Sequence, residues 1–94
     1  MGVFEPRTIR ALRMELGAAH VACAMAPKLP PDQQEKIACT VPREIAAAAR
    51  AAAAAGRRDA ARQILDRRLA DPPKACPRGT TWEKILQAGF DGLS

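Results

Sequence analysis

Apolar residues return every three or four positions through the first quarter of the chain. This spacing places them on one side of an α-helix, in a stripe made of Ile9, Leu12, Leu16, Ala19 and Cys23. A second row is expected to flank the stripe and broaden the apolar face: Met14, Val21 and Met25. Pro6 suits the first turn of a helix, and Pro27 should stop it. We therefore predict a first helix within residues 1–26.

Prolines divide the next segment. The connection that leaves the first helix should be rigid and extended because it contains Pro27, Pro30 and Pro31. A short helix is expected from Pro31 to about Cys39. Val41 should end that helix, because the residue before a proline (here Pro42) avoids helical geometry. Residues 27–41 are thus predicted to form a Pro-rich connection that carries one short helix.

The alanine-rich stretch that follows is the strongest pattern in the chain. Residues 46–55 are nine alanines interrupted only by Arg50, and Gly56 comes next. Alanine is the best helix former, and glycine most readily ends a helix in a left-handed conformation. A second arm has an apolar face made of Ile64, Leu65 and Leu69. We predict that residues 42–73 form an antiparallel helical hairpin whose arms pack closely through small side chains.

Residues 74–94 are predicted to be a loop followed by an amphipathic helix. Its apolar face consists of Trp82, Ile85, Leu86 and Phe90, and Gly89 is expected to adopt a left-handed conformation at its C-terminal end. No segment has the alternation of a strand. The sequence therefore predicts an all-α fold: one domain of residues 1–94, a small bundle of about five helical segments around the central hairpin.

The hairpin resembles a single tetratricopeptide repeat, on the strength of Gly56, Ala61, Leu65, Leu69 and Pro73. The resemblance covers about a third of the chain. It implies a two-helix unit and the protein-binding habit of that family. The same residues also suit an ordinary antiparallel helical hairpin in a small bundle.

Composition predicts a thin core. Apolar residues make up 48% of the 94 residues, but 21 of them are alanine, whose methyl group contributes far less on burial than a leucine side chain. Stability is thus expected to depend on helix propensity, on a protein partner or on self-association. A homodimer is therefore one of the arrangements that the sequence allows.

Arginine gives the chain its net charge of +5. One cluster recurs every third residue at the start of the first helix: Arg7, Arg10 and Arg13. A second cluster follows the predicted turn: Arg57, Arg58, Arg62, Arg67 and Arg68. Both clusters suit solvated helix faces. They equally suit contacts with phosphates, and for nucleic acid the candidate residues are Arg7, Arg10, Arg13, Arg57 and Arg58.

The only histidine and the three cysteines could in principle make a Cys3His zinc site: His20, Cys23, Cys39 and Cys76. These residues fall on separate segments and contain no Cys-x-x-Cys pair, so we expect reduced thiols, no metal and no cofactor. No nucleophile stands beside a base, and no phosphate-binding loop or dinucleotide motif occurs. The sequence therefore argues against an enzyme.

Three functions remain. The preferred one is a non-catalytic protein-binding module, which would be a small adaptor, regulator or stoichiometric inhibitor. A phage or a mobile element is one expected source of such a protein. Its candidate binding residues are Trp82, Phe90, Arg57, Arg58 and Arg62. Trp82 could instead close the core of the domain. The alternatives are an arginine-dependent nucleic-acid binder and a Cys/His metal- or redox-responsive regulator. We expect a cytoplasmic protein without membrane contact, because no apolar run approaches the ~20 residues of a membrane span and charged residues occupy the place of a signal sequence.

Overall fold

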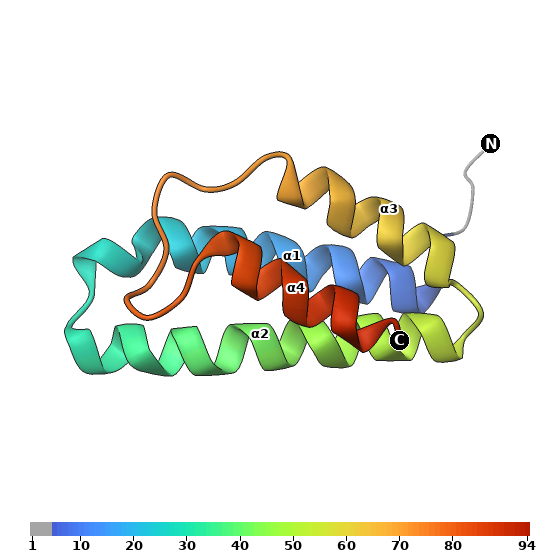
Figure 1. Ribbon diagram of the computed structural model, residues 1–94, viewed down its shortest axis with the longest axis horizontal. Helices are drawn as coiled ribbons and strands as arrows, with labels where there is room; N and C mark the ends of the chain where they lie inside the picture. Colours follow the sequence, from blue (N-terminus) through green and yellow to red (C-terminus); the bar gives the residue numbers. More distant parts are fainter. Residues whose placement is uncertain (1–4) are drawn as a thin grey trace.

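The computed structural model describes residues 5–94, and all regular structure in that range is helical (Figure 1). The elements are α1 (Arg7–Met25), a 3-10 turn η1 (Ala26–Lys28), α2 (Pro31–Ala54), α3 (Arg58–Leu69) and α4 (Trp82–Gly92). The predicted all-α class is thus confirmed for the described residues. The number of helical segments roughly matches the prediction, but the chain is divided between them differently.

Helix α1 follows the prediction most closely. It begins directly after Pro6 and ends before Pro27. All five residues of the predicted stripe are buried in the core, from Ile9 to Cys23. The periodicity of the sequence therefore placed the inner face of this helix correctly.

The predicted break at Val41 and Pro42 is wrong, because both residues lie inside helix α2. It runs without interruption from Pro31 to Ala54, with Pro42 inside it. A proline in a helix interior loses one backbone hydrogen bond and costs about 3 kcal/mol. The buried face nevertheless continues on both sides of Pro42, through Gln34 before it and Ile45 after it. Tertiary packing of this long face outweighs the local preference, as is usual for helices in proteins.

The partner of the alanine face also differs from the prediction. Helix α2 makes its most extensive contacts with α4 and the next most extensive with α1, whereas α3 shares its contacts among the other three helices. The chain does turn back at Gly56, whose φ of 78° is left-handed as expected. A hairpin of α2 and α3 at the centre of the fold is not confirmed. Figure 1 shows α4 lying along α2, while α3 returns on the other side of the molecule.

Two glycines let α4 approach α2 closely. A Cβ atom on Gly92 would lie 2.5 Å from the carbonyl oxygen of Ala46, and one on Gly89 would lie 2.8 Å from side-chain atoms of Ile45 and Leu65. The prediction that Gly89 ends its helix in a left-handed conformation is wrong, because Gly89 is buried within α4. The positive φ values among the described glycines belong to Gly56 and Gly79.

The large side chains of the core come from all four helices, and the fully buried ones include Leu12, Leu16, Ile45, Leu65, Ile85 and Leu86. Within residues 5–94, none of the helices combines the length and the apolar character needed to cross a bilayer.

Candidate functional site

The outward face of α1 is apolar and open to solvent. Met14, Val21 and Met25 are exposed by 68%, 57% and 54%. Two exposed alanines lie on the same face, Ala11 before Met14 and Ala18 between Met14 and Val21. We call these five residues the outer stripe of α1. Single exposed apolar residues are common on protein surfaces, but three large ones on one helix face form a continuous patch, and such patches mark binding sites.

The prediction that Met14, Val21 and Met25 flank and broaden the buried face is wrong, because all three are exposed. The signal needed to place them was present. At 3.6 residues per turn, Met14 lies about 200° around the helix from Leu16, which is nearly opposite the centre of the buried stripe. Val21 lies three residues after Ala18, and Met25 lies four residues after Val21, so all three stay on the same outward side of the helix. Helix α1 therefore has two apolar faces, and the fold uses only one of them.

Two carboxyl groups lie together beside the outer stripe, one on α1 and one on α2. Partial burial and, after it, the nearby Glu44 carboxyl raise the pKa of Glu15 above its ordinary value of 4.5. Glu44 itself is exposed, and it also lines an open hollow of about 470 Å³ on α2 with Thr40, Arg43 and Ala47. This edge of the outer stripe therefore carries negative charge that a cation on a partner could neutralise.

Replacing Glu15 by glutamine should raise the thermal unfolding midpoint slightly at pH 7, because solvent screens this half-exposed pair, and change it little near pH 3. The raised pKa means that the folded state disfavours the ionised carboxyl. That penalty is absent below the unfolded pKa, where the side chain is protonated in both states, and it develops as the pH rises through the folded pKa. Unfolding midpoints measured from pH 3 to pH 7 test this. Glu35→Gln, an exposed change on α2, is the control, and an equal gain in both variants would contradict the prediction.

A basic hollow lies between α1 and α3. Arg13, Arg67 and Arg68 line it together with Ile64, and its volume is about 160 Å³. The structure thereby joins the two arginine clusters that lie far apart in the sequence. The Arg68 guanidinium lies beside Gly17 of α1, where a Cβ would be 3.8 Å from one of its terminal nitrogens, an ordinary contact distance. Arg13 also forms an ion pair with Glu5.

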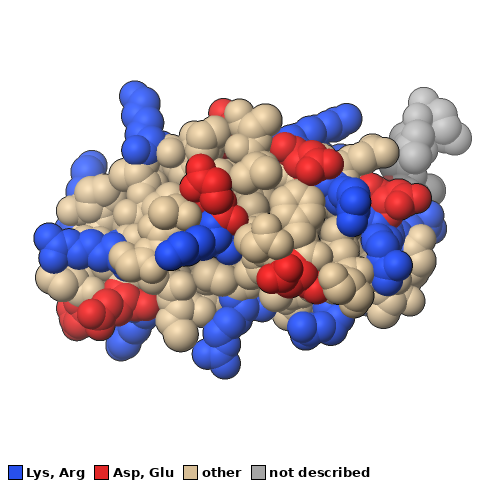
Figure 2. All heavy atoms as spheres, viewed as in Figure 1, with Lys and Arg blue, Asp and Glu red and all other residues tan. Residues whose placement is uncertain are grey.

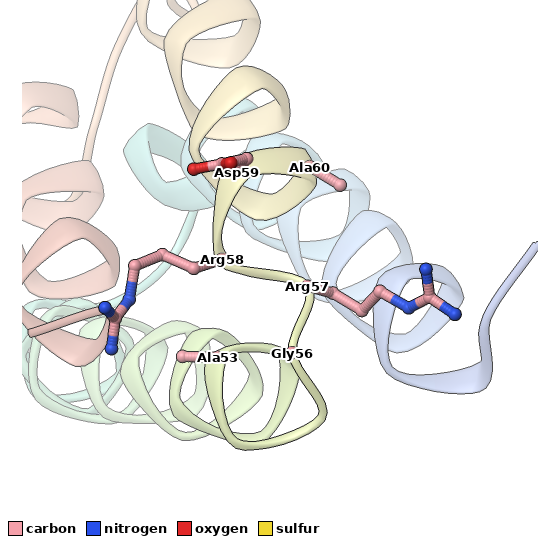
Figure 3. A pocket seen from close by; sticks show the side chains of 6 residues that line it. All are labelled: Ala53, Gly56, Arg57, Arg58, Asp59 and Ala60. Carbon is pink, nitrogen blue, oxygen red and sulfur yellow. The ribbon is translucent and has the colours of Figure 1, made fainter.

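The remaining predicted arginines do not converge. Arg57 and Arg58 flank an open hollow of about 550 Å³ at the turn between α2 and α3, but their side chains extend to opposite sides of that turn (Figure 3). Arg7, Arg10 and Arg62 are exposed. On the face shown in Figure 2, basic and acidic side chains are interspersed. That face offers no extended area of one charge.

The two candidate aromatic anchors contribute to the core. Trp82 is only 3% exposed, and its indole N–H donates a 2.7 Å hydrogen bond to the carbonyl oxygen of Arg68. Its ring also meets the ring of His20 edge-on, with 5.6 Å between the centroids. Phe90 is half-buried against the same core. Trp82 therefore closes the core, the second of the two roles considered for it, and is not presented to a partner in this structure.

The four candidate metal ligands are only partly brought together. Cys23 is buried, and burial, followed by the neighbouring Cys76 thiol, raises its pKa to about 12. Cys39 is exposed on α2, and His20 contacts Trp82 while its Nδ1 has no hydrogen-bond partner. No group of three or more histidine, cysteine, aspartate or glutamate side chains in residues 5–94 is arranged to hold a metal ion. A thiol with such a high pKa is also a poor nucleophile.

Comparisons with protein-family models, with curated proteins and with solved structures give no match to this chain. The resemblance of residues 42–73 to a tetratricopeptide repeat therefore stays a prediction.

Proposed function

We propose that this protein is a non-catalytic protein-binding module that acts by covering a surface of its partner with the outer stripe of α1. The observation that carries the proposal is the exposure of Met14, Val21 and Met25 on one uncharged helix face. Burying apolar surface contributes roughly 25 cal/mol per Å², so this stripe supplies a driving force for association. A stoichiometric regulator or inhibitor in the cytoplasm is the role that fits such a surface.

Charge favours a helix of a different protein as the occupant. The outer stripe is bordered by Arg10 at one end of α1 and is followed by Lys28 at the other, and both are exposed. Two copies docked antiparallel would bring Arg10 of one near Lys28 of the other. Two copies docked in parallel would bring Arg10 near Arg10 and Lys28 near Lys28. Both arrangements place like charges together. A partner helix with an apolar face and a lysine or arginine aimed at Glu15 and Glu44 meets complementary charge instead.

Replacing Met14 and Val21 together by glutamine should weaken partner binding at least tenfold and leave the fold intact. Glutamine is a good helix former that keeps the net charge, and exposed substitutions usually change stability by less than about 0.5 kcal/mol. The partner would be isolated from the native host, identified, produced separately and titrated against both forms. Leu69→Gln is the matched control, because Leu69 is a large exposed apolar residue on α3.

Two results would contradict the proposal. One is equal affinity of the double variant and the unsubstituted protein for the identified partner. The other is a dimer of the chain itself, measured by mass in solution, that the double variant abolishes, because it would make a second copy the occupant.

Nucleic-acid binding through phosphate contacts is the second candidate function. It is favoured by one observation, the convergence of Arg13, Arg67 and Arg68 on one hollow. Such binding should weaken steeply as salt increases, whereas docking on the outer stripe should change little.

A further inference from the structure

The basic hollow between α1 and α3 gathers more positive charge than the fold requires. Among residues 5–94 the ion pair present is the one between Arg13 and Glu5, so no acidic side chain in that range pairs with Arg67 or Arg68. Like charges held close together repel one another unless an anion lies between them. The fold nevertheless keeps Arg68 half-buried, with its head over Gly17.

Arg68 is tied to the core through its backbone and lies beside α1 with its side chain. Its backbone carbonyl accepts the Trp82 indole hydrogen bond, which fixes the end of α3 relative to the core. Its terminal nitrogen lies over the one position of the neighbouring α1 surface that has no side chain. Arg13 lines the hollow from α1 while it is paired with Glu5, so the donors of the hollow come from two different helices.

We propose that this hollow is a binding site for a phosphate monoester. A guanidinium presents a planar fork of donors that matches the oxygens of a phosphate group. Arg67 and Arg68, which pair with no acidic side chain of residues 5–94, supply two positive charges for a dianion, and Arg13 lines the hollow beside them. The hollow of about 160 Å³ has room for a group the size of several water molecules, at about 30 Å³ each. The site lies on the α3 side of α1 and does not require the outer stripe to bind anything.

The observations favour a single phosphate group over a nucleic-acid strand. The hollow is small, about 160 Å³, and Arg57 and Arg58 point away from one another at the turn (Figure 3). Strand binding normally adds aromatic side chains on which bases stack. Within residues 5–94, Trp82 is buried and Phe90 is half-buried in the core. The phosphate can belong to a small metabolite or to a phosphorylated side chain, since both present the same dianion.

Titration of the full chain with inorganic phosphate, and then with O-phosphoserine and a phosphoserine peptide, tests the site. We expect saturable binding at pH 7.5 that weakens at pH 5, because the second ionisation of a phosphate monoester lies near pH 6. Arg67→Gln and Arg68→Gln should each weaken binding at least tenfold. Arg62→Gln removes the same charge from an exposed position on α3 that does not line the hollow, and it should leave affinity unchanged.

The comparison of probes identifies the source of the phosphate. Tighter binding of the peptide than of O-phosphoserine assigns the site to a phosphorylated protein, and equal binding assigns it to a small phosphate. Equal weakening by all three arginine variants, or the absence of saturable binding by any probe, overturns the proposal. Preferential binding of a single-stranded oligonucleotide with a steep salt dependence overturns it as well, since the ligand would then be a phosphodiester backbone. The Met14→Gln, Val21→Gln double variant should bind phosphate normally, so failure of this site and failure of the outer stripe are distinguishable.

Discussion

Replacing Gly92 by alanine is expected to destabilise the protein by at least the ~1–3 kcal/mol typical of an overpacked core. The added Cβ would lie 2.5 Å from the Ala46 carbonyl oxygen and 3.3 Å from its Cα and carbonyl carbon. These are backbone atoms in the middle of α2, so they cannot rotate aside. Helix α4 would have to move away from α2, which is its most extensive contact in the fold.

Two further glycine variants make the prediction an ordered series. Gly89→Ala should cost less than Gly92→Ala, because the nearest atoms, at 2.8 Å, are the ends of the Ile45 and Leu65 side chains. Gly17→Ala should leave stability unchanged or raise it, because its nearest neighbour is at 3.8 Å and alanine exceeds glycine in helix propensity by ~1 kcal/mol. Urea unfolding followed by circular dichroism gives the free energies. A Gly92→Ala variant as stable as Gly17→Ala would show that α4 does not lie this close to α2.

The same glycines show why the sequence predicted the helices better than their packing. Alanine methyl groups define a smooth face but do not specify which element covers it. The hairpin interpretation assigned the face of residues 46–55 to the nearest helix in the sequence. The pattern that identifies the actual partner is the pair Gly89 and Gly92, three residues apart on one face of α4. A helix without side chains at these two positions can approach its neighbours closely, with Gly92 against the backbone of Ala46 and Gly89 against the side chains of Ile45 and Leu65.

The prediction failed at Pro42 for a different physical reason. Local rules describe how much a proline destabilises a helix, but they do not include the free energy gained when a long helix face is buried. Val41 is half-buried and Ile45 fully buried on the same side of α2. Breaking the helix at Val41 would turn that face away from α1 and α4. Whether burial of this face outweighs the destabilising effect of Pro42 depends on the helices that cover the face, and the local sequence does not identify them.

The two surface features of α1 differ in how far the sequence predicts them. The sequence shows the arginines of the basic hollow as two separate clusters, and Arg13 and Arg67 are too far apart along the chain for spacing to join them. By contrast, the outer stripe could have been predicted from helical angles alone. Met14, Val21 and Met25 fall on the side of α1 opposite its buried stripe, and no described element covers them.

Replacing Trp82 by alanine is expected to cost ~3–5 kcal/mol, the usual range for a large buried aromatic residue. This loss approaches the whole stability of a small domain, so the variant should be largely unfolded at 37 °C. Trp82→Phe should be intermediate, since phenylalanine fills much of the space but leaves the Arg68 carbonyl without the indole donor. Because Trp82 is the only tryptophan, unfolding must be followed by circular dichroism instead of fluorescence.

The Trp82 variants also separate the two roles that sequence analysis considered for this residue. An interface anchor loses partner binding on substitution while the free protein keeps its unfolding free energy. A core residue loses stability first, and any loss of binding follows from the unfolded fraction. We expect Trp82→Phe, measured at a temperature where it remains folded, to bind the partner as tightly as the unsubstituted protein, because the outer stripe lies on the opposite side of α1 from the core. Full stability of Trp82→Ala together with lost binding would reverse this assignment and return Trp82 to the interface.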